Sequence, residues 1–198
     1  GMRFDHCYVT NSICTPSRAA ILTGTHNHVN GVTTLITPLD NRLPNVAKEL
    51  QTGGYQTAIF GKWHLGHTPD TLPTVRGYDR ALALAQSGAD NFEDKPNLLI
   101  YDKTEWTEDG KPAKLPKRFY SSTLIVDKMI GYIDRGKASG KPFLASVNFI
   151  ANHIPVQARD ADIAAYAGRY NVGWTVLRNE RRAAAIALGS CSRTSASQ

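Results

Sequence analysis

Two long apolar runs, separated by polar and glycine-rich stretches, are the clearest pattern along the chain. Residues 55–60 are rich in β-branched and aromatic side chains and follow Gly53 and Gly54, which favours a strand after a turn. Residues 142–150 are almost continuously apolar, a pattern typical of a strand that is covered on both faces. The two runs predict two strands of a buried sheet.

Two other segments have the apolar spacing of helices. Residues 119–136 predict an amphipathic helix that Ser121 or Ser122 caps, and its expected core stripe consists of Val126, Met129, Ile130 and Ile133. A shorter helix is predicted from Leu43 and Pro44 to the glycines at 53 and 54, and its expected apolar face consists of Val46, Ala47 and Leu50. Helices alternating with strands indicate the α/β class.

Residues 86–116 form the least regular part of the chain. We expect mostly loop there, with one small strand at residues 98–101. The segment carries scattered acids, namely Asp90, Asp94, Asp102 and Asp109. Their spacing matches no metal-binding loop, so we interpret them as solvated side chains.

Composition limits the function only weakly. The chain has 198 residues and a formal net charge of +6, which is compatible with one domain. Basic residues are somewhat enriched in the last forty positions, so a basic nucleic-acid-binding fragment is a rival hypothesis, although no nucleic-acid-binding motif is present. The sequence contains no candidate membrane span and no signal peptide.

The three cysteines, Cys7, Cys14 and Cys191, match neither a zinc pattern nor an even disulfide set. Cys7 and Cys191 are able to pair if Cys14 is modified. Cys191 falls in the segment 189–198, which we predict to be a disordered tail after a catalytic domain over residues 1–188.

A third predicted helix carries the most informative chemistry. Thr15 is its expected N-cap, Pro16 suits its first position and Gly24 its end. Cys14 then lies at the positive end of the helix, and Arg18 adds a forked cation. This arrangement favours a sulfate- or phosphate-like anion beside Cys14.

The sequence around Cys14 resembles the signature of the type I sulfatases. Residues 14–18 read Cys-Thr-Pro-Ser-Arg and continue into an Ala-x-x-Leu-Thr-Gly stretch, and residues 61–66 resemble the family's Gly-Lys-Trp-His block. The resemblance implies an alkaline-phosphatase-like sandwich with a mostly parallel sheet flanked by helices. It also implies that Cys14 is converted to formylglycine, whose hydrated aldehyde attacks the sulfur of a sulfate ester and then expels sulfate.

The resemblance also implies roles for further residues. Lys62 bridges the formylglycine and a sulfate oxygen, and His64 hydrogen-bonds the formylglycine hydroxyl; if the backbone stays extended, both side chains point to the same side. His153 follows the second strand and is expected to bind sulfate and protonate the leaving oxygen, although Asn152 replaces the family's first proline there. Arg18 completes the expected catalytic set.

The family's metal-binding blocks are absent from these 198 residues. The resemblance implies a divalent cation, usually Ca²⁺, that carboxylates hold against the formylglycine made from Cys14. Such a cation needs several oxygen ligands. We therefore interpret the chain as an internal fragment with little activity alone, in which the sheet is incomplete at both ends.

Several functional points stay open at the level of sequence. A phosphonate or phosphate monoester hydrolase of the same superfamily is an alternative, since tetrahedral oxyanions need similar clamps. The expected partners are a sulfate ester and a formylglycine-generating or sulfatase-maturating enzyme. The location is undetermined, with a periplasmic or secreted site compatible with the sequence.

Overall fold

The computed structural model describes residues 4, 7–98 and 101–190 and divides into two compact units. One unit spans residues 10–157, and the other comprises residues 1–9 and 158–198. The second unit contains α5 (Asp160–Ala165) and α6 (Gly173–Ala187). No helix among the described residues is long and apolar enough to cross a membrane. A single domain over 1–188 stays a prediction, and residues 191–198 of the expected tail lie outside the described residues.

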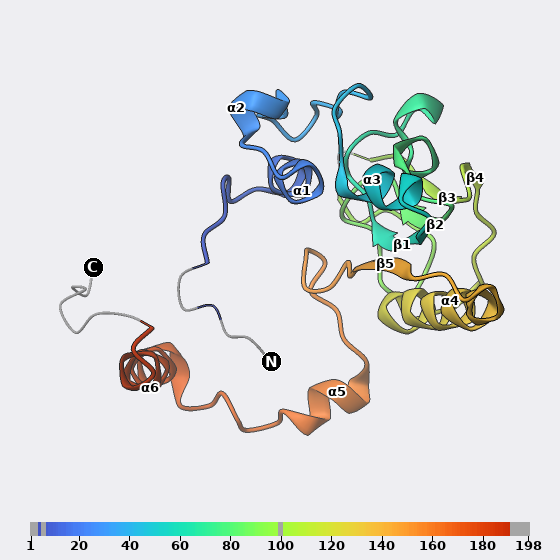
Figure 1. Ribbon diagram of the computed structural model, residues 1–198. Helices are drawn as coiled ribbons and strands as arrows, with labels where there is room; N and C mark the ends of the chain where they lie inside the picture. The colour runs from blue at the N-terminus through green and yellow to red at the C-terminus, as the bar shows by residue number, and fades with distance from the viewer. Residues whose placement is uncertain (1–3, 5–6, 99–100, 191–198) are drawn as a thin grey trace. The chain divides into compact units, whose positions relative to one another are not determined.

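The larger unit is built on one five-stranded sheet with the order β4-β3-β2-β1-β5 (Figure 1). Its strands are β1 (Gln56–Lys62), β2 (Arg80–Leu84), β3 (Trp106–Glu108), β4 (Lys111–Pro112) and β5 (Phe143–Asn148). β1 pairs in parallel with β2 and β5, whereas β3 and β4 add an antiparallel hairpin beside β2. The α/β class with a mostly parallel core is therefore confirmed.

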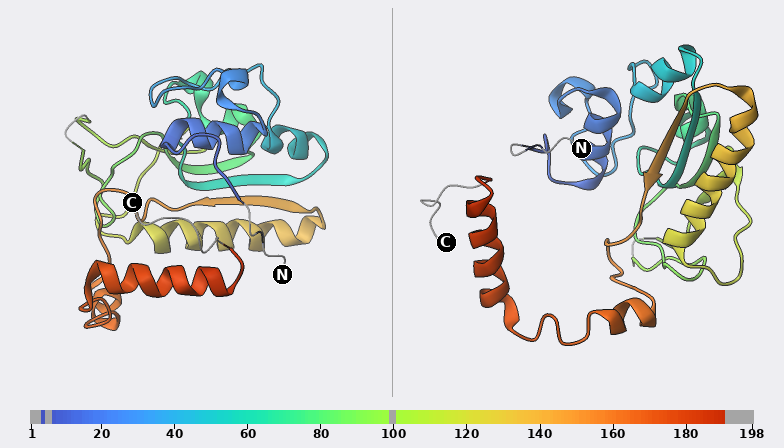
Figure 2. Two further views of the ribbon diagram at one scale, coloured as in Figure 1. Left: turned by 90° about the vertical axis from the view of Figure 1, so that its left-hand side faces the viewer. Right: turned by 60° about the horizontal axis from the view of Figure 1, so that its bottom comes forward.

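Helices cover both faces of this sheet (Figure 2). α4 (Ser121–Gly136) packs on one face of β1 and β5. α3 (Val46–Thr52) packs on the other face beside α1 (Cys14–Thr23), which contacts the short α2 (Asn27–Asn30). Side chains of β1 alternate accordingly: Ile59 joins the core under α1 and α3, while Ala58 and Phe60 join the core under α4. Three short 3₁₀ segments complete the unit: η1 (Pro69–Thr71), η2 (Pro73–Arg76) and η3 (Lys137–Ser139).

Residues 142–150 pack on both faces of the sheet, as expected, but only partly: Leu144 contacts the core under α1 and α3, and Val147 contacts the core under α4. β5 is the last strand in the sheet order, and its side chains are half-buried, with Phe143 50% exposed. The run ends as a strand at Asn148, and Ile150 is buried beyond it. A continuous apolar run thus marks the strand correctly but does not reveal its position in the sheet.

Both predicted side-chain caps are also wrong, because tertiary partners take the hydroxyl groups. Thr15 is the second residue of α1 and donates its hydroxyl to the carbonyl of Leu35 over 2.9 Å. Ser121 is fully buried at the start of α4 and donates to Asn91. In α3 the cap is Asn45, whose side chain accepts from the amide of Lys48.

Two of the predicted helix faces need correction. In the expected stripe of α4, Met129 and Ile133 pack partly buried against the core, whereas Ile130 is 49% exposed. The fully buried residues of the helix are Ser121, Ile125 and Tyr132. In α3 Ala47 is buried but Val46 is exposed. The helices themselves, and their ends at Gly24 and Gly53, are as predicted.

The stretch 86–116 contains more structure than the sequence suggested, since it supplies β3 and β4. The proposed small strand at 98–101 includes residues 99–100, which lie outside the described residues. Asp90 is not a solvated acid: it is 4% exposed and accepts four hydrogen bonds, from the amides of Phe92 and Glu93 and the side chains of Asn97 and Gln157.

Gly61 holds β1 and β5 close together near the carboxyl end of β1. Its φ is +104°, and a Cβ added there would lie 2.0 Å from the carbonyl oxygen of Asn148. Only glycine fits this position without moving the backbone of β5.

Gly61→Ala is expected to lower the free energy of unfolding by about 3 kcal/mol or more, because the new methyl group must displace a strand backbone. Gly53→Ala is the matched control, since its φ is −74° and the nearest atoms lie 3.4 Å away. That control should change stability by less than about 1 kcal/mol. Urea unfolding followed by circular dichroism measures both, and equal effects would contradict this account of Gly61.

Candidate active site

Cys14 is the first residue of α1, and it is partly buried. The preceding residue, Ile13, has an extended backbone and provides no side-chain cap, and the first turn holds no acidic residue. Within its own first turn, the positive end of the helix is therefore not neutralised by a carboxylate.

Arg18 connects α1 to the sheet. Its Nη1 donates to the backbone carbonyl of Lys62 over 2.8 Å, and the side chain of Asn148 donates to the same carbonyl over 3.0 Å. Burial lowers the pKa of Arg18, while negative charge on Cys14 acts in the opposite direction. Even so, a guanidinium stays protonated at any ordinary pH.

Lys62 is the last residue of β1 and is only 3% exposed. Its Nζ donates to Oγ of Ser87 over 2.7 Å. Burial lowers the pKa of Lys62, negative charge on Cys14 raises it and the nearby Arg18 lowers it. Cys14 is thus among the groups that act on the ammonium of Lys62.

His64 also lies beside the neighbours of Cys14, but the backbone that carries it is not extended as expected. Its φ is +53°, so the backbone leaves the extended conformation after Trp63. Its Nδ1 is buried and has no hydrogen-bond partner among the described residues. Burial lowers the pKa of His64 to about 4, with further contributions from Lys62, Arg18 and His153. His64 is therefore neutral at pH 7.

His153 follows β5 and faces the same group of side chains. Its Nδ1 lies 2.7 Å from the carbonyl of Ile154, and its Nε2 lies 3.3 Å from Oγ of Ser87. A carbonyl only accepts, so Nδ1 carries the proton and Nε2 accepts from the Ser87 hydroxyl. Ser87 in turn accepts from Lys62, which gives a hydrogen-bonded series from Lys62 through Ser87 to His153.

Ser87 is the main residue that the sequence reasoning missed. It is buried and lies three residues beyond the end of β2, a strand that was not predicted. The available signal was the apolar run at 81–85 that ends in Gln86 and Ser87. Side chains just past the carboxyl ends of parallel strands gather at one edge, and Lys62, Ser87 and His153 follow the three adjacent strands.

A buried polar network holds the loop after His153 in place. The side-chain oxygen of Gln157 accepts from the amide of Asn91 over 2.9 Å, and its Nε2 donates to Asp90 over 2.8 Å. Asn91 is fully buried and accepts from Ser121 of α4. The segments that carry Ser87 and His153 are thereby tied to each other and to the start of α4.

Two further histidines and one cysteine lie apart from this group. His26 and His28 stack with ring centroids 5.7 Å apart, but both are exposed on the chain around α2 and neither lines the cavity beside His64. Cys7 is exposed, and the suggested pairing with Cys191 involves a residue outside the described part of the chain.

The residues around Cys14 do not fit a calcium site. Calcium takes six to eight oxygen ligands, whereas this group offers an ammonium, a guanidinium and two imidazoles. No carboxylate is among the groups that shift the pKa of Lys62 or His64. Among the described residues, no cluster of three or more His, Cys, Asp or Glu side chains is arranged to hold a metal. What the group does fit is a tetrahedral oxyanion.

Comparisons with known proteins agree with this chemistry. A family model described as Sulfatase matches residues 1–192. The chain is 32% identical over 203 residues to an arylsulfatase of Klebsiella aerogenes, covering 96% of this chain and 43% of that protein. It is 37% identical over 153 residues to an N-acetylglucosamine-6-O-sulfatase of Bacteroides thetaiotaomicron, covering 77% of this chain and 24% of that protein.

A solved structure supports the fold as well. The crystal structure of Ps i-CgsB matches with a TM-score of 0.74 and 27% identity, covering 83% of this chain and 40% of that one. The chain thus spans less than half the length of each of these three proteins.

The depressed pKa of His64 predicts how stability depends on pH. Between about pH 6.5 and pH 4 the unfolded chain binds a proton at His64 that the folded chain excludes, so stability falls as the pH is lowered through this window. His64→Gln should therefore lose less stability than the parent over the same window, measured as Tm by differential scanning calorimetry. The control His28→Gln, on an exposed side chain, should follow the parent. A parallel decline in His64→Gln and the parent would contradict the assignment.

Proposed function

The chain belongs to the sulfatase family, and from that membership we propose that it forms the nucleophile and anion-binding part of a sulfate ester hydrolase. The observation that carries the proposal is the gathering of Arg18, Lys62, His64 and His153 around the amino end of the helix that begins at Cys14. Arg18 comes from α1, Lys62 and His64 come from the end of β1, and His153 follows β5, so the group is a product of the fold.

The surroundings of Cys14 fit its conversion to formylglycine. The uncapped helix end and the two cations favour negative charge on an oxygen at this position. Formylglycine supplies a hydrated aldehyde as nucleophile and a means of releasing sulfate by re-forming its carbonyl group. A formylglycine-generating or sulfatase-maturating enzyme is the partner that the conversion requires.

Lys62 is the residue that we assign to the sulfate group itself. Its ammonium is buried against a neutral hydroxyl, and burial without a carboxylate makes an arriving anion a favourable partner. Arg18 has a different task, because one of its N–H groups is engaged by the carbonyl of Lys62. It positions β1 against α1 and adds a fixed positive charge.

The two histidines receive different roles because their environments differ. His64 is neutral at pH 7 and has a buried, unpartnered nitrogen, which suits a hydrogen bond to the hydroxyl at position 14 rather than proton donation. His153 presents Nε2 to Ser87 and sits at the opening of the group, partly exposed. In the imidazolium form Nε2 of His153 carries a proton and donates instead of accepting, and in that form we assign it to the sulfate and to protonation of the leaving oxygen.

A divalent cation is not assigned to this chain, since the described residues do not fit one. The proposal therefore includes low activity for the 198-residue polypeptide by itself, because a sulfate ester is left without the further charge stabilisation that family members use.

The test is to co-express the chain with a formylglycine-generating enzyme and to measure the Cys14 peptide by mass spectrometry. We expect a peptide lighter by about 18 Da, since oxygen replaces sulfur and two hydrogens. Turnover of 4-nitrophenyl sulfate should be lost in Cys14→Ala and should lie at least about 100-fold below that of a full-length arylsulfatase.

Three results would oppose the proposal. Equal turnover by Cys14→Ala and the parent would show that position 14 does not supply the nucleophile. Turnover matching a full-length arylsulfatase would refute the predicted low activity. Faster turnover of a phosphonate monoester than of the sulfate ester would identify the alternative phosphonate hydrolase instead.

A further inference from the structure

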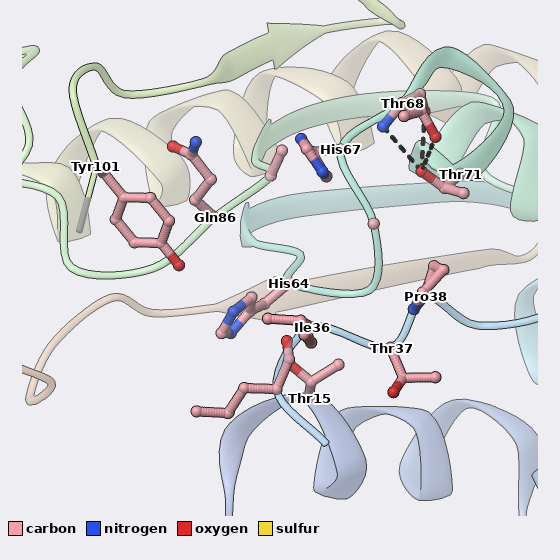
Figure 3. Close-up of a pocket in the computed structure, with 13 residues that line it drawn as sticks. Thr15, Ile36, Thr37, Pro38, His64, His67, Thr68, Thr71, Gln86 and Tyr101 are labelled. Carbon is pink, nitrogen blue, oxygen red and sulfur yellow. Dashed lines mark hydrogen bonds between the residues drawn. The ribbon is translucent and has the colours of Figure 1, made fainter. Parts of the chain in front are cut away.

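A cavity of about 210 Å³ adjoins the candidate active site. His64 and Thr15 belong to its wall, and Thr15 follows Cys14 in α1 (Figure 3). Tyr101 lies on another wall of the cavity, and burial raises the pKa of its phenol. A group attached to sulfate at Cys14 has this cavity as its neighbour.

Polar side chains without internal partners face the cavity from three segments of the chain. No hydrogen bond of the Gln86 amide, the Tyr101 hydroxyl or the His64 ring is found among the described residues. The hydroxyl of Thr37, by contrast, already pairs with that of Thr34 over 2.7 Å. In Figure 3 the Tyr101 hydroxyl is turned toward His64, and Gln86 lies nearby on the same side.

Resting on the sulfatase function proposed above, we infer that this cavity binds the alcohol part of the ester and that Gln86 and Tyr101 select an alcohol carrying further hydroxyl or amide groups, such as a sugar ring, over an unsubstituted aryl alcohol. Both side chains donate and accept hydrogen bonds, which matches hydroxyl groups on neighbouring carbons. Leu35, Ile36 and Pro38 supply an apolar wall for the carbon face of such a ring.

Size and desolvation support the same class of ligand. The cavity is smaller than the roughly 300–1,000 Å³ typical of drug-sized ligands, so a single ring is the appropriate occupant. A plain phenyl group of similar size would cover Gln86 and Tyr101 without replacing the water they lose. Sites that hydrogen-bond a ligand reject analogues that leave such groups unpaired.

The test measures binding rather than turnover, using the chain with unconverted Cys14 and isothermal titration calorimetry. The three probes are inorganic sulfate, glucosamine 6-O-sulfate and phenyl sulfate. We expect the sugar sulfate to bind about tenfold more tightly than inorganic sulfate and more tightly than the aryl sulfate.

Variants separate the cavity from the anion site. Gln86→Leu and Tyr101→Phe should each weaken the sugar sulfate about three- to tenfold and leave inorganic sulfate unchanged. Thr37→Val is the matched control on the same wall, and its effect should be small because that hydroxyl already has a partner. Circular dichroism checks that each variant folds. If Gln86→Leu does not fold, Tyr101→Phe, which removes only one oxygen atom, still tests the cavity.

The outcomes distinguish this inference from the proposed function. Absence of inorganic sulfate binding, or binding unaffected by Lys62→Ala, counts against the anion site and thus against the proposed function. Normal sulfate binding with the sugar sulfate no tighter than the aryl sulfate, or with both cavity variants unchanged, overturns the inference alone.

Discussion

The backbone carbonyl of Lys62 is the point on which the candidate site depends. Arg18 of α1 and Asn148 of β5 both donate to this single oxygen, over 2.8 and 3.0 Å. The helix that presents Cys14 is thereby tied to the end of the strand that presents Lys62, and both are tied to the strand that leads to His153. Gly61 makes the junction possible, because a side chain there would push β5 away from β1.

Electrostatics explains why this junction suits an anion. The helix end at Cys14 has no side-chain cap, and Lys62 and Arg18 are largely withdrawn from water. In the described part of the chain, no carboxylate shifts the pKa of Lys62 or His64. Buried cations without a negative partner are unfavourable, so an oxyanion placed among them is strongly favoured. Burial, and after it the charges of Lys62, Arg18 and His153, lowers the pKa of His64 to about 4 and keeps it neutral at pH 7.

The sequence points to the candidate site residues that sit in continuous motifs, and it does not point to those that only the fold brings beside them. Cys14, Arg18, Lys62 and His64 lie in two specific blocks, and His153 follows a recognisable apolar strand. Ser87, Asp90 and Gln157 lie in irregular segments with no periodic signal, and their importance comes from partners up to 67 positions away.

The hydroxyl groups of Thr15 and Ser121 looked like helix caps for the same reason: local propensity cannot reveal a tertiary acceptor. The fold class was predictable because strand and helix patterns are local, whereas the edge position of β5 was not.

The central claim is that an oxyanion binds beside Cys14, between Lys62 and His153. Crystals of the chain soaked in selenate, with anomalous data collected at the selenium edge, would locate the anion without any need for turnover. The account predicts a selenium peak beside Cys14, with selenate oxygens about 3 Å from Nζ of Lys62 and Nε2 of His153. Selenate bound elsewhere on the surface, with none between these groups at saturating concentration, would contradict it.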